Sequence, residues 1–328
     1  MKKLSRIPRR AAAGALAALL AAPWAPSSAQ QYPSKTVRLI IAYAAGGGTD
    51  TVGRVIAQKL AEGLGKPVIV DNRPGAGGNI ATELAVRSPA DGYTLLMGNI
   101  GPIAVNPHLY KLAFDPLRDL APVSLIALAP LLVVVHPSLP VSSLKDLVAL
   151  ARREPGKLTY SSAGVGSSNH LAGALFNIAA GTDVVHVPYK GAAPAVTDLL
   201  AGNVQLSFQT LPSVGGNVRA KRLKALAVSS ARRSAAYPEV PTAAEAGLKG
   251  FEVSAWYSLV APAGTPRPIV DRLREELVKA LGQKDVLDRL TADGAEPVGN
   301  TPEAFGEFMR SESAKWARVV KLSGMKAD

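Results

Sequence analysis

An apolar strand followed at once by a glycine-rich turn and a helix is the feature that most limits how this chain can fold. The run 37–43 (VRLIIAY) is mostly apolar and has no helical spacing, which is typical of a strand covered on both faces of a parallel sheet. The turn 46–50 (GGGTD) follows it, and apolar residues then recur at three- and four-residue steps from Val52 to Leu60. This unit predicts an α/β fold.

The same order of strand, turn and helix returns along the chain. Further strands are expected at 68–70, 93–97, 158–161, 184–187, 204–208 and 226–229. Two long extended runs, 123–135 and 251–260, bracket the second group of strands. We therefore expect two lobes, each a mixed sheet flanked by helices, joined by two hinge strands and separated by a ligand cleft. The first lobe would comprise residues 30–127 and 257–328, and the second residues 128–256.

The N-terminus has the organisation of a signal peptide. Five basic residues lie within the first ten positions, the apolar run 11–22 follows, and Ser27, Ser28 and Ala29 are small residues suited to cleavage. The apolar run is shorter than the about 20 residues that span a membrane. We predict a signal peptide at 1–29 and a mature protein in the periplasm. Export by the general secretory route is favoured over the twin-arginine route that Arg9 and Arg10 suggest.

Composition excludes several chemistries. The chain has no cysteine, which rules out disulfides, thiolate metal sites and cysteine nucleophiles. The four histidines have no short ligand spacing, so no metal site and no cofactor are expected. The short basic clusters at 152–153, 221–224 and 232–233 lack interleaved aromatic residues. In an exported protein they indicate solvated surfaces, and nucleic acid is not an expected partner.

Two turns are candidates for binding an anion. Glycine-rich turns at helix N-termini leave main-chain N–H groups free, and the peptide dipoles favour negative charge there. Two such turns facing each other could hold a carboxylate without an arginine. Glycines that only allow close packing of strand and helix remain the alternative. The candidate residues are Gly47, Gly48, Thr49 and Asp50 in the first turn, Ser162, Ala163, Gly164, Val165, Gly166, Ser167, Ser168 and Asn169 in the second, and Tyr189 near the same sheet edge.

Catalytic motifs fit poorly. Gly46 and Gly48 match two positions of the dinucleotide fingerprint, but Thr51 stands where its third glycine should be. Neither a phosphate-binding P-loop nor a nucleophile elbow occurs. Asp50 is expected to cap a helix rather than to act as an acid or base. We predict a binding protein and not an enzyme, with a secreted hydrolase or lyase as the alternative. Trp256 and Tyr257 are expected to pack in the hinge, with a ligand platform as their alternative role.

Eight motifs in order resemble one family. They are YAAGGGTD (43–50), NRPGAGG (72–78), DGYTLL (91–96), PGKL (155–158), SSAGVGSSNHL (161–171), HVPYKG (186–191), PTAAEAG (241–247) and APAGTP (261–266). Together they are similar to the Bug family, the substrate-binding receptors of tripartite tricarboxylate transporters. Ala45 departs from the proline that usually precedes the three glycines.

The resemblance implies a type II periplasmic binding protein (Venus flytrap) that closes on a small organic acid. It also implies delivery to a permease of one large and one small integral membrane subunit. Tyr43 would form a wall of the cleft, and the two turns would hold a carboxylate through main-chain groups. The identity of the acid does not carry over, and the stretches 99–105 and 209–216 are expected to decide it. A ligand-presenting partner of a membrane sensor is the alternative role.

Overall fold

The computed structural model describes residues 32–292 and 294–327. The predicted signal peptide, residues 1–29, lies outside the described residues. The chain from Lys35 onward forms one compact unit. None of the described helices combines the length and the apolar character needed to cross a membrane.

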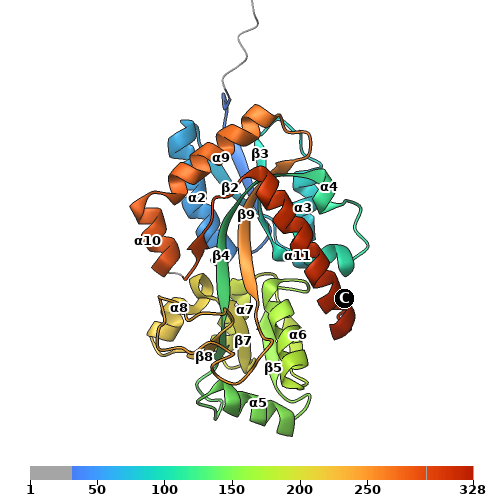
Figure 1. The fold of residues 1–328 in the computed structure, drawn as a ribbon, viewed down its shortest axis with the longest axis vertical. Coiled ribbons are helices and arrows are strands. Elements are labelled where there is room, and N and C mark those ends of the chain that lie inside the picture. The colour runs from blue at the N-terminus through green and yellow to red at the C-terminus, as the bar shows by residue number, and fades with distance from the viewer. Residues whose placement is uncertain (1–31, 293, 328) are drawn as a thin grey trace, which may run out of the picture. The chain divides into compact units, whose positions relative to one another are not determined.

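Three parallel strands and two helices open this unit (Figure 1). Strand β1 (Val37–Ile41) lies between β2 (Val68–Asn72) and β3 (Thr94–Asn99) and runs parallel to both. Helix α2 (Gly48–Leu64) follows β1, and helix α3 (Asn79–Val86) follows β2. The chain therefore passes from β1 to its neighbour β2, and from β2 it crosses back over β1 to β3. Right-handed crossovers in opposite directions place α2 and α3 on opposite faces of the sheet.

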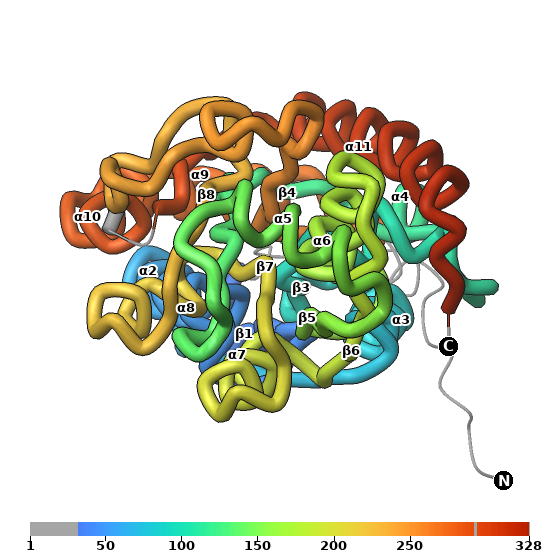
Figure 2. The backbone as a smooth tube through the Cα atoms, turned by 90° about the horizontal axis from the view of Figure 1, so that it is seen from below, coloured from blue at the N-terminus to red at the C-terminus, as the bar shows by residue number. Residues whose placement is uncertain are grey.

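The second group of strands repeats this arrangement. Strand β5 (Thr159–Ser162) lies between β6 (Val185–Pro188) and β7 (Leu206–Thr210) and is parallel to both. Helix α6 (Ser168–Ala180) connects β5 to β6, and helix α7 (Ala192–Leu200) connects β6 to β7. Seen from below in Figure 2, the helices of this group lie on both sides of its strands.

Two long strands belong to both groups. β4 (Leu120–Val135) and β9 (Ser254–Pro262) pair antiparallel from Leu120 opposite Pro262 to Pro130 opposite Ser254. β9 also pairs with β3, whereas the end of β4 pairs with β7 and with β8 (Lys224–Val228). In Figure 1 they run side by side along the unit, with β1, β2 and β3 at one end and β5, β7 and β8 at the other. The prediction of two mixed sheets flanked by helices is confirmed.

The remaining elements complete the two lobes. They are η1 (Ala76–Gly78), η2 (Gly101–Val105), η3 (Asn106–His108), α4 (Pro116–Asp119), α5 (Leu144–Arg153), α8 (Leu211–Arg219), α9 (Arg267–Leu281), α10 (Lys284–Ala292), β10 (Glu296–Pro297) and α11 (Pro302–Ser323). Trp316 on α11 is fully buried, as expected. The second extended run is shorter at its start than expected, because β9 begins at Ser254.

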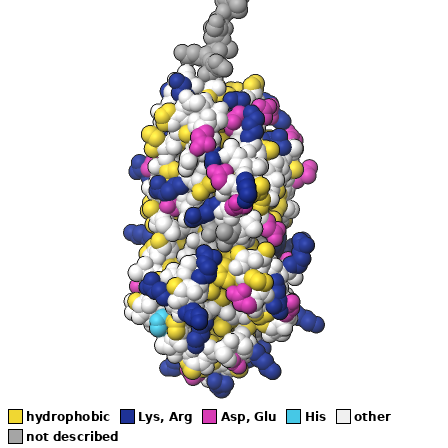
Figure 3. Space-filling model, turned by 90° about the vertical axis from the view of Figure 1, so that its left-hand side faces the viewer, with side chains coloured by type: hydrophobic (Ala, Val, Ile, Leu, Met, Phe, Trp, Pro, Cys, Tyr) yellow, Lys and Arg dark blue, Asp and Glu magenta, His cyan; other side chains and the backbone are white. Residues whose placement is uncertain are grey.

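The core of each lobe lies between its strands and the helices that cover them. On β1 the side chains of Leu39, Ile40 and Ile41 are fully buried, as a strand covered on both faces requires. The basic clusters lie at the surface, where Arg152, Arg153 and Arg232 are exposed. Figure 3 shows one face of the molecule, on which lysine and arginine side chains are dispersed among acidic ones.

Candidate ligand-binding site

A cavity lies where the carboxyl ends of the parallel strands of both lobes meet. Its volume is about 30 Å³, so the residues that line it lie close together. Open α/β sheets bind ligands at this edge, where neighbouring crossovers leave the sheet in opposite directions. The turn after β1, the end of β3, the turn after β5 and the end of β7 all contribute to the lining.

The turn after β1 supplies Tyr43, Gly47, Gly48 and Thr49 to the cavity wall. Gly47 caps helix α2 without a side-chain hydrogen bond, so the first turn of α2 presents main-chain N–H groups toward the cavity. The N–H of Gly48 donates to Ser213 Oγ at 3.0 Å. A Cβ atom on Gly48 would lie 2.6 Å from Thr210 Oγ1 and 2.7 Å from Tyr257 Oη. Only glycine therefore fits at this position.

Asp50 does not reach the cavity. Its carboxylate accepts hydrogen bonds at 2.9 Å from the Gly46 N–H, from Arg54 Nε and from Asn72 Nδ2. Burial alone would raise the pKa of Asp50, but these donors outweigh burial and hold the pKa below its usual range. Asp50 thus stabilises the first turn through hydrogen bonds on the side away from the cavity. The structure does not place it among the cavity-lining residues.

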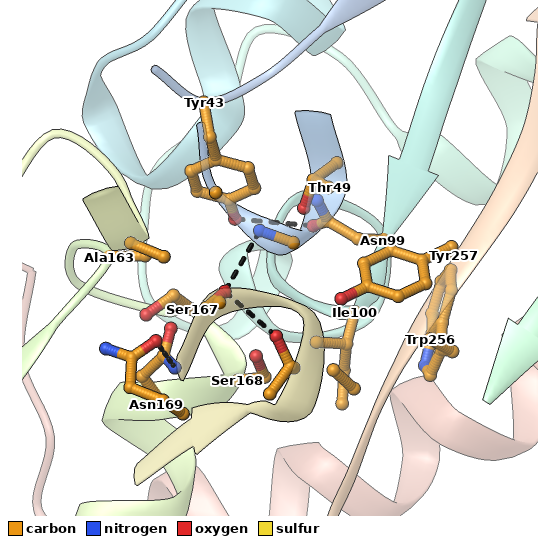
Figure 4. A pocket seen from close by; sticks show the side chains of 17 residues that line it. Tyr43, Thr49, Asn99, Ile100, Ala163, Ser167, Ser168, Asn169, Trp256 and Tyr257 are labelled. Carbon is orange, nitrogen blue, oxygen red and sulfur yellow. Dashed lines mark hydrogen bonds between the residues drawn. The ribbon is translucent and has the colours of Figure 1, made fainter. Parts of the chain in front are cut away.

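The turn after β5 supplies Ala163, Ser167, Ser168 and Asn169. Ser167 caps helix α6, with its Oγ accepting from the His170 N–H at 3.4 Å. Asn169 Nδ2 donates to the Phe208 carbonyl and to Gln209 Oε1, which lies 3.2 Å away. In Figure 4 Tyr43, Thr49 and Asn99 lie above the cavity, and Ser167, Ser168 and Asn169 lie below it. The two predicted turns therefore face each other across one cavity.

Ser162 and Gly166 of the second turn do not line this cavity and support the turn instead. Ser162 is fully buried, and its Oγ lies 2.6 Å from His186 Nε2. The Gly166 N–H donates to His170 Nδ1 at 3.1 Å, so the His170 ring accepts a hydrogen bond from the turn. The rings of His170 and His186 stack at 3.9 Å between centroids. Burial lowers the pKa of His186 to about 4, which keeps that ring neutral at pH 7.

The other candidates lie in a neighbouring cavity. Gly164, Val165 and Tyr189 line a cavity of about 290 Å³ that the turn 75–78 also lines. Tyr43 and Ala163 line both cavities and separate them. The Tyr189 hydroxyl donates to Asp198 Oδ2 at 2.5 Å. The structure therefore does not bring Tyr189 to the cavity that the two turns share.

The strand ends add residues that the glycine pattern does not identify. The end of β3 contributes Asn99, and Ile100 follows it. The junction of β7 and α8 contributes Gln209, Thr210 and Ser213. These residues fall within or next to the stretches expected to decide specificity. These residue types are common and belong to no motif. From the sequence, only their position at the carboxyl ends of predicted strands indicates that they line a ligand site.

Hinge strand β9 supplies the remaining aromatic wall through Trp256 and Tyr257. The Trp256 indole N–H donates to Glu312 on α11 at 3.2 Å, and its ring meets Phe305 edge to face. Trp256 thus has the packing role that was expected. It also borders the cavity, so the two roles considered for it are compatible.

Four helix N-termini meet at this cavity, and none of its lining side chains in the described part of the chain is charged. Helices α2 and α6 were expected; α7 adds Ala192 beside its cap Gly191, and α8 adds its cap Thr210. Each helix N-terminus carries roughly half a positive charge. The cavity therefore favours an anion without any cationic side chain. No group of His, Asp and Glu side chains among the described residues could hold a metal ion.

Two lobes joined by paired hinge strands around an electropositive cavity define a two-lobed solute-binding protein. Residues 52–325 match the tripartite tricarboxylate transporter family receptor, and the chain belongs to this family. Protein BugT of Bordetella pertussis is 40% identical over 304 residues, which cover 92% of this chain and 93% of BugT. The resemblance to the Bug family is confirmed, and the chain is a solute-binding receptor of a tripartite transporter.

Solved structures of similar proteins have the same fold. The periplasmic binding protein BugD matches with a TM-score of 0.87 and 34% identity, covering 90% of this chain and 99% of BugD. A protein of R. palustris solved with adipate gives 0.88 and 38%, with 90% and 99% coverage. MatC of Rhodopseudomonas palustris, solved with bound malate, gives 0.85 and 34%, with 88% and 100% coverage. The chain therefore has the fold of periplasmic binding proteins.

Proposed function

We propose that this receptor captures a small organic acid in the cavity between its lobes and delivers it to integral membrane permease subunits. The observation that carries this proposal is the convergence of four helix N-termini on a cavity lined by uncharged side chains. The similar proteins solved with adipate and with malate support a small dicarboxylic acid as the ligand. The site requires no metal and no cofactor.

The carboxylate is held by main-chain donors from both lobes. The N–H groups of Gly47 and Thr49 act from helix α2, and those of Ser168 and Asn169 act from helix α6. A hydrogen bond to a charged group contributes about 1.5–3 kcal/mol. Three or four such bonds offset the cost of immobilising a small acid and give an affinity of about 1 μM. Tyr43 closes the wall beside the carboxylate.

The N-terminal segment supports export of the protein to the periplasm. Residues 1–29 direct export and are removed, and the receptor then works in the periplasm. Residues 30–127 and 257–328 form the first lobe, and residues 128–256 form the second, with β4 and β9 as the hinge. Lobe closure around the acid creates the surface that the permease recognises.

Catalysis is not part of the proposal. The Ser162 and His186 side chains form a hydrogen-bonded pair, which is the minimum for an activated nucleophile. Ser162 is fully buried, and neither residue lines the cavity. Asp50 is engaged by three donors behind the turn. No substrate in the cavity would reach these groups, which supports a binding role.

The proposal is tested by thermal shift and calorimetry on the mature protein, residues 30–328. Succinate, glutarate, adipate and malate are compared with adipamide, which matches adipate in size but carries no charge. A ligand at 100 times its dissociation constant adds about 2.7 kcal/mol to the free energy of unfolding. We expect at least one acid, but not adipamide, to stabilise the protein. Stabilisation by a neutral sugar or by adipamide, with none by any acid, would contradict the proposal.

A further inference from the structure

Asn99 is a buried side chain whose amide is only half satisfied. It is the last residue of β3, where it lies opposite Tyr257 on β9, and it is 5% exposed. Its Oδ1 accepts from the Tyr43 hydroxyl at 3.3 Å, and its Nδ2 has no hydrogen-bond partner among the described residues. Buried polar atoms in proteins are nearly always paired, because an unpaired donor loses its hydration without compensation. This donor therefore calls for an acceptor.

The position of Asn99 identifies where that acceptor would come from. Of the four side chains with an unpartnered buried polar atom in the described part of the chain, Asn99 is the one that lines the cavity. In Figure 4 it lies between Tyr43 and Tyr257, across the cavity from Ser168 and Asn169. A ligand whose carboxylate rests on the α6 N-terminus would thus place its other end toward Asn99.

Several polar side chains near Asn99 in the cavity already form hydrogen bonds within the protein. Gln209 and Asn169 also line the cavity, but their amide groups bond to each other, to Ser207 and to the main chain. Thr210 and Ser213 bond to each other, and Ser213 also accepts from the Gly48 N–H. No cationic side chain lines the cavity among the described residues. Thr49, Ser168 and Tyr257 also bring hydroxyl groups to the cavity, but Asn99 Nδ2 is the buried donor of the lining that has no partner among the described residues.

Resting on the proposed function, we infer that Asn99 Nδ2 donates to a second oxygen acceptor of the bound acid. Asn99 is thereby a determinant of ligand choice, and the receptor selects acids with an oxygen at the far end over acids with an alkyl tail of equal length. The Tyr43 hydroxyl lies 3.3 Å from Asn99 Oδ1 and 3.3 Å from the Gly77 carbonyl oxygen, on the other side of the amide from Nδ2.

The test compares matched pairs of acids by calorimetry: succinate with butyrate, glutarate with valerate and adipate with hexanoate. 6-Hydroxyhexanoate distinguishes a hydroxyl from a carboxylate as the acceptor. For the wild-type protein we expect the best-bound diacid to bind at least about tenfold more tightly than its monoacid. Asn99→Leu should bring this ratio close to one while leaving monoacid affinity within about threefold.

Asn99→Asp provides a second variant of nearly unchanged shape. Its carboxylate should repel the far carboxylate of a diacid, so diacid affinity falls more than monoacid affinity at pH 7.5. If both variants keep the wild-type ratio of diacid to monoacid affinity, Asn99 does not contribute to ligand selection and the inference is wrong. The proposed receptor function is unaffected by that result. If the wild-type protein binds no acid in the series, the receptor function fails and this inference fails with it.

Discussion

The main-chain N–H of Gly48 donates to the side chain of Ser213 at 3.0 Å, and this bond joins the N-terminus of α2 to that of α8. Ser213 Oγ also lies 3.0 Å from Thr210 Oγ1, so Gly48 is linked to two hydroxyl groups at the junction of β7 and α8. The turn 75–78 and the turn after β5 also approach each other closely at Gly77, where an added Cβ atom would lie 2.2 Å from the Val165 carbonyl oxygen. Glycines at the lobe junction therefore set how closely the two lobes can approach.

Replacing Gly48 by alanine should weaken ligand binding without unfolding the protein. The new Cβ would meet the Thr210 and Tyr257 hydroxyl oxygens at distances that real Cβ atoms do not adopt, so these side chains, or the elements that carry them, would have to shift at the cavity. We expect the dissociation constant for the best acid to rise at least about tenfold, measured by calorimetry. Gly216→Ala is the control, since that glycine has open space around it and alanine favours the helix. Equal affinity in both variants would show that this junction does not control closure.

The partly buried His186 should make stability depend on pH. Its pKa is about 4 in the folded protein and 6.5 without burial, so below pH 6.5 the unfolded chain takes up a proton that the folded protein excludes. Stability is complete above pH 6.5 and falls as the pH drops toward 4, by a few kcal/mol at most, since one pKa unit corresponds to about 1.4 kcal/mol. Urea unfolding at pH 7.5, 6.0 and 5.0 measures this. The decline should be smaller in His186→Gln, and identical slopes would refute the assignment.

Glu312 should anchor the last helix to the hinge. Its Oε2 accepts from the indole N–H groups of Trp256 at 3.2 Å and of Trp316 at 3.0 Å. Removing the acceptor leaves two indole donors of fully buried rings unpaired, which costs about 1–3 kcal/mol for each donor. Glu312→Ala should therefore unfold at markedly lower urea concentration than Glu312→Gln, which keeps one oxygen. Glu307→Ala, at an exposed position of the same helix, is the control. Equal stability of all three variants would contradict this role.

Asp50 should act on the first turn and not on a substrate. Asp50→Asn replaces one of the two oxygens that accept from Gly46, Arg54 and Asn72, so we expect a loss of about 1–3 kcal/mol in unfolding free energy. Affinity for the acid should fall as well, because the turn after β1 loses a hydrogen bond that holds its conformation. Asp288→Asn removes an exposed ion pair on α10 and should change stability by less than about 1 kcal/mol. A stability change in Asp288→Asn as large as in Asp50→Asn would argue against a specific brace.

The sequence predicts those parts of the site that depend on local pattern. The turns after β1 and β5 stand out because glycine and serine follow apolar strands, and the structure places them on one cavity. Helix α8 was missed because Pro212, Gly215 and Gly216 lower its helical propensity, and tertiary packing overrides that propensity. Asp50 and Ser162 were assigned to the ligand because they lie in these turns. Their partners Asn72 and His186 are distant in sequence, so local spacing could not reveal that both side chains are already engaged.

Asn99 illustrates what the sequence alone leaves open. Whether its side chain faces the cavity depends on the register of β3 against β9, since a shift of one residue would reverse the direction of every side chain on the strand. That register is set by long-range packing of the hinge strands.

The central claim is that main-chain donors at helix N-termini, and no cationic side chain, bind the acid. A crystal structure of the mature protein with its best-binding diacid tests this most directly. We predict that carboxylate oxygens lie within about 3.2 Å of main-chain nitrogens in the turns after β1 and β5, or reach them through one water molecule. A carboxylate paired with a lysine or arginine side chain, or bound away from both turns, would contradict the claim.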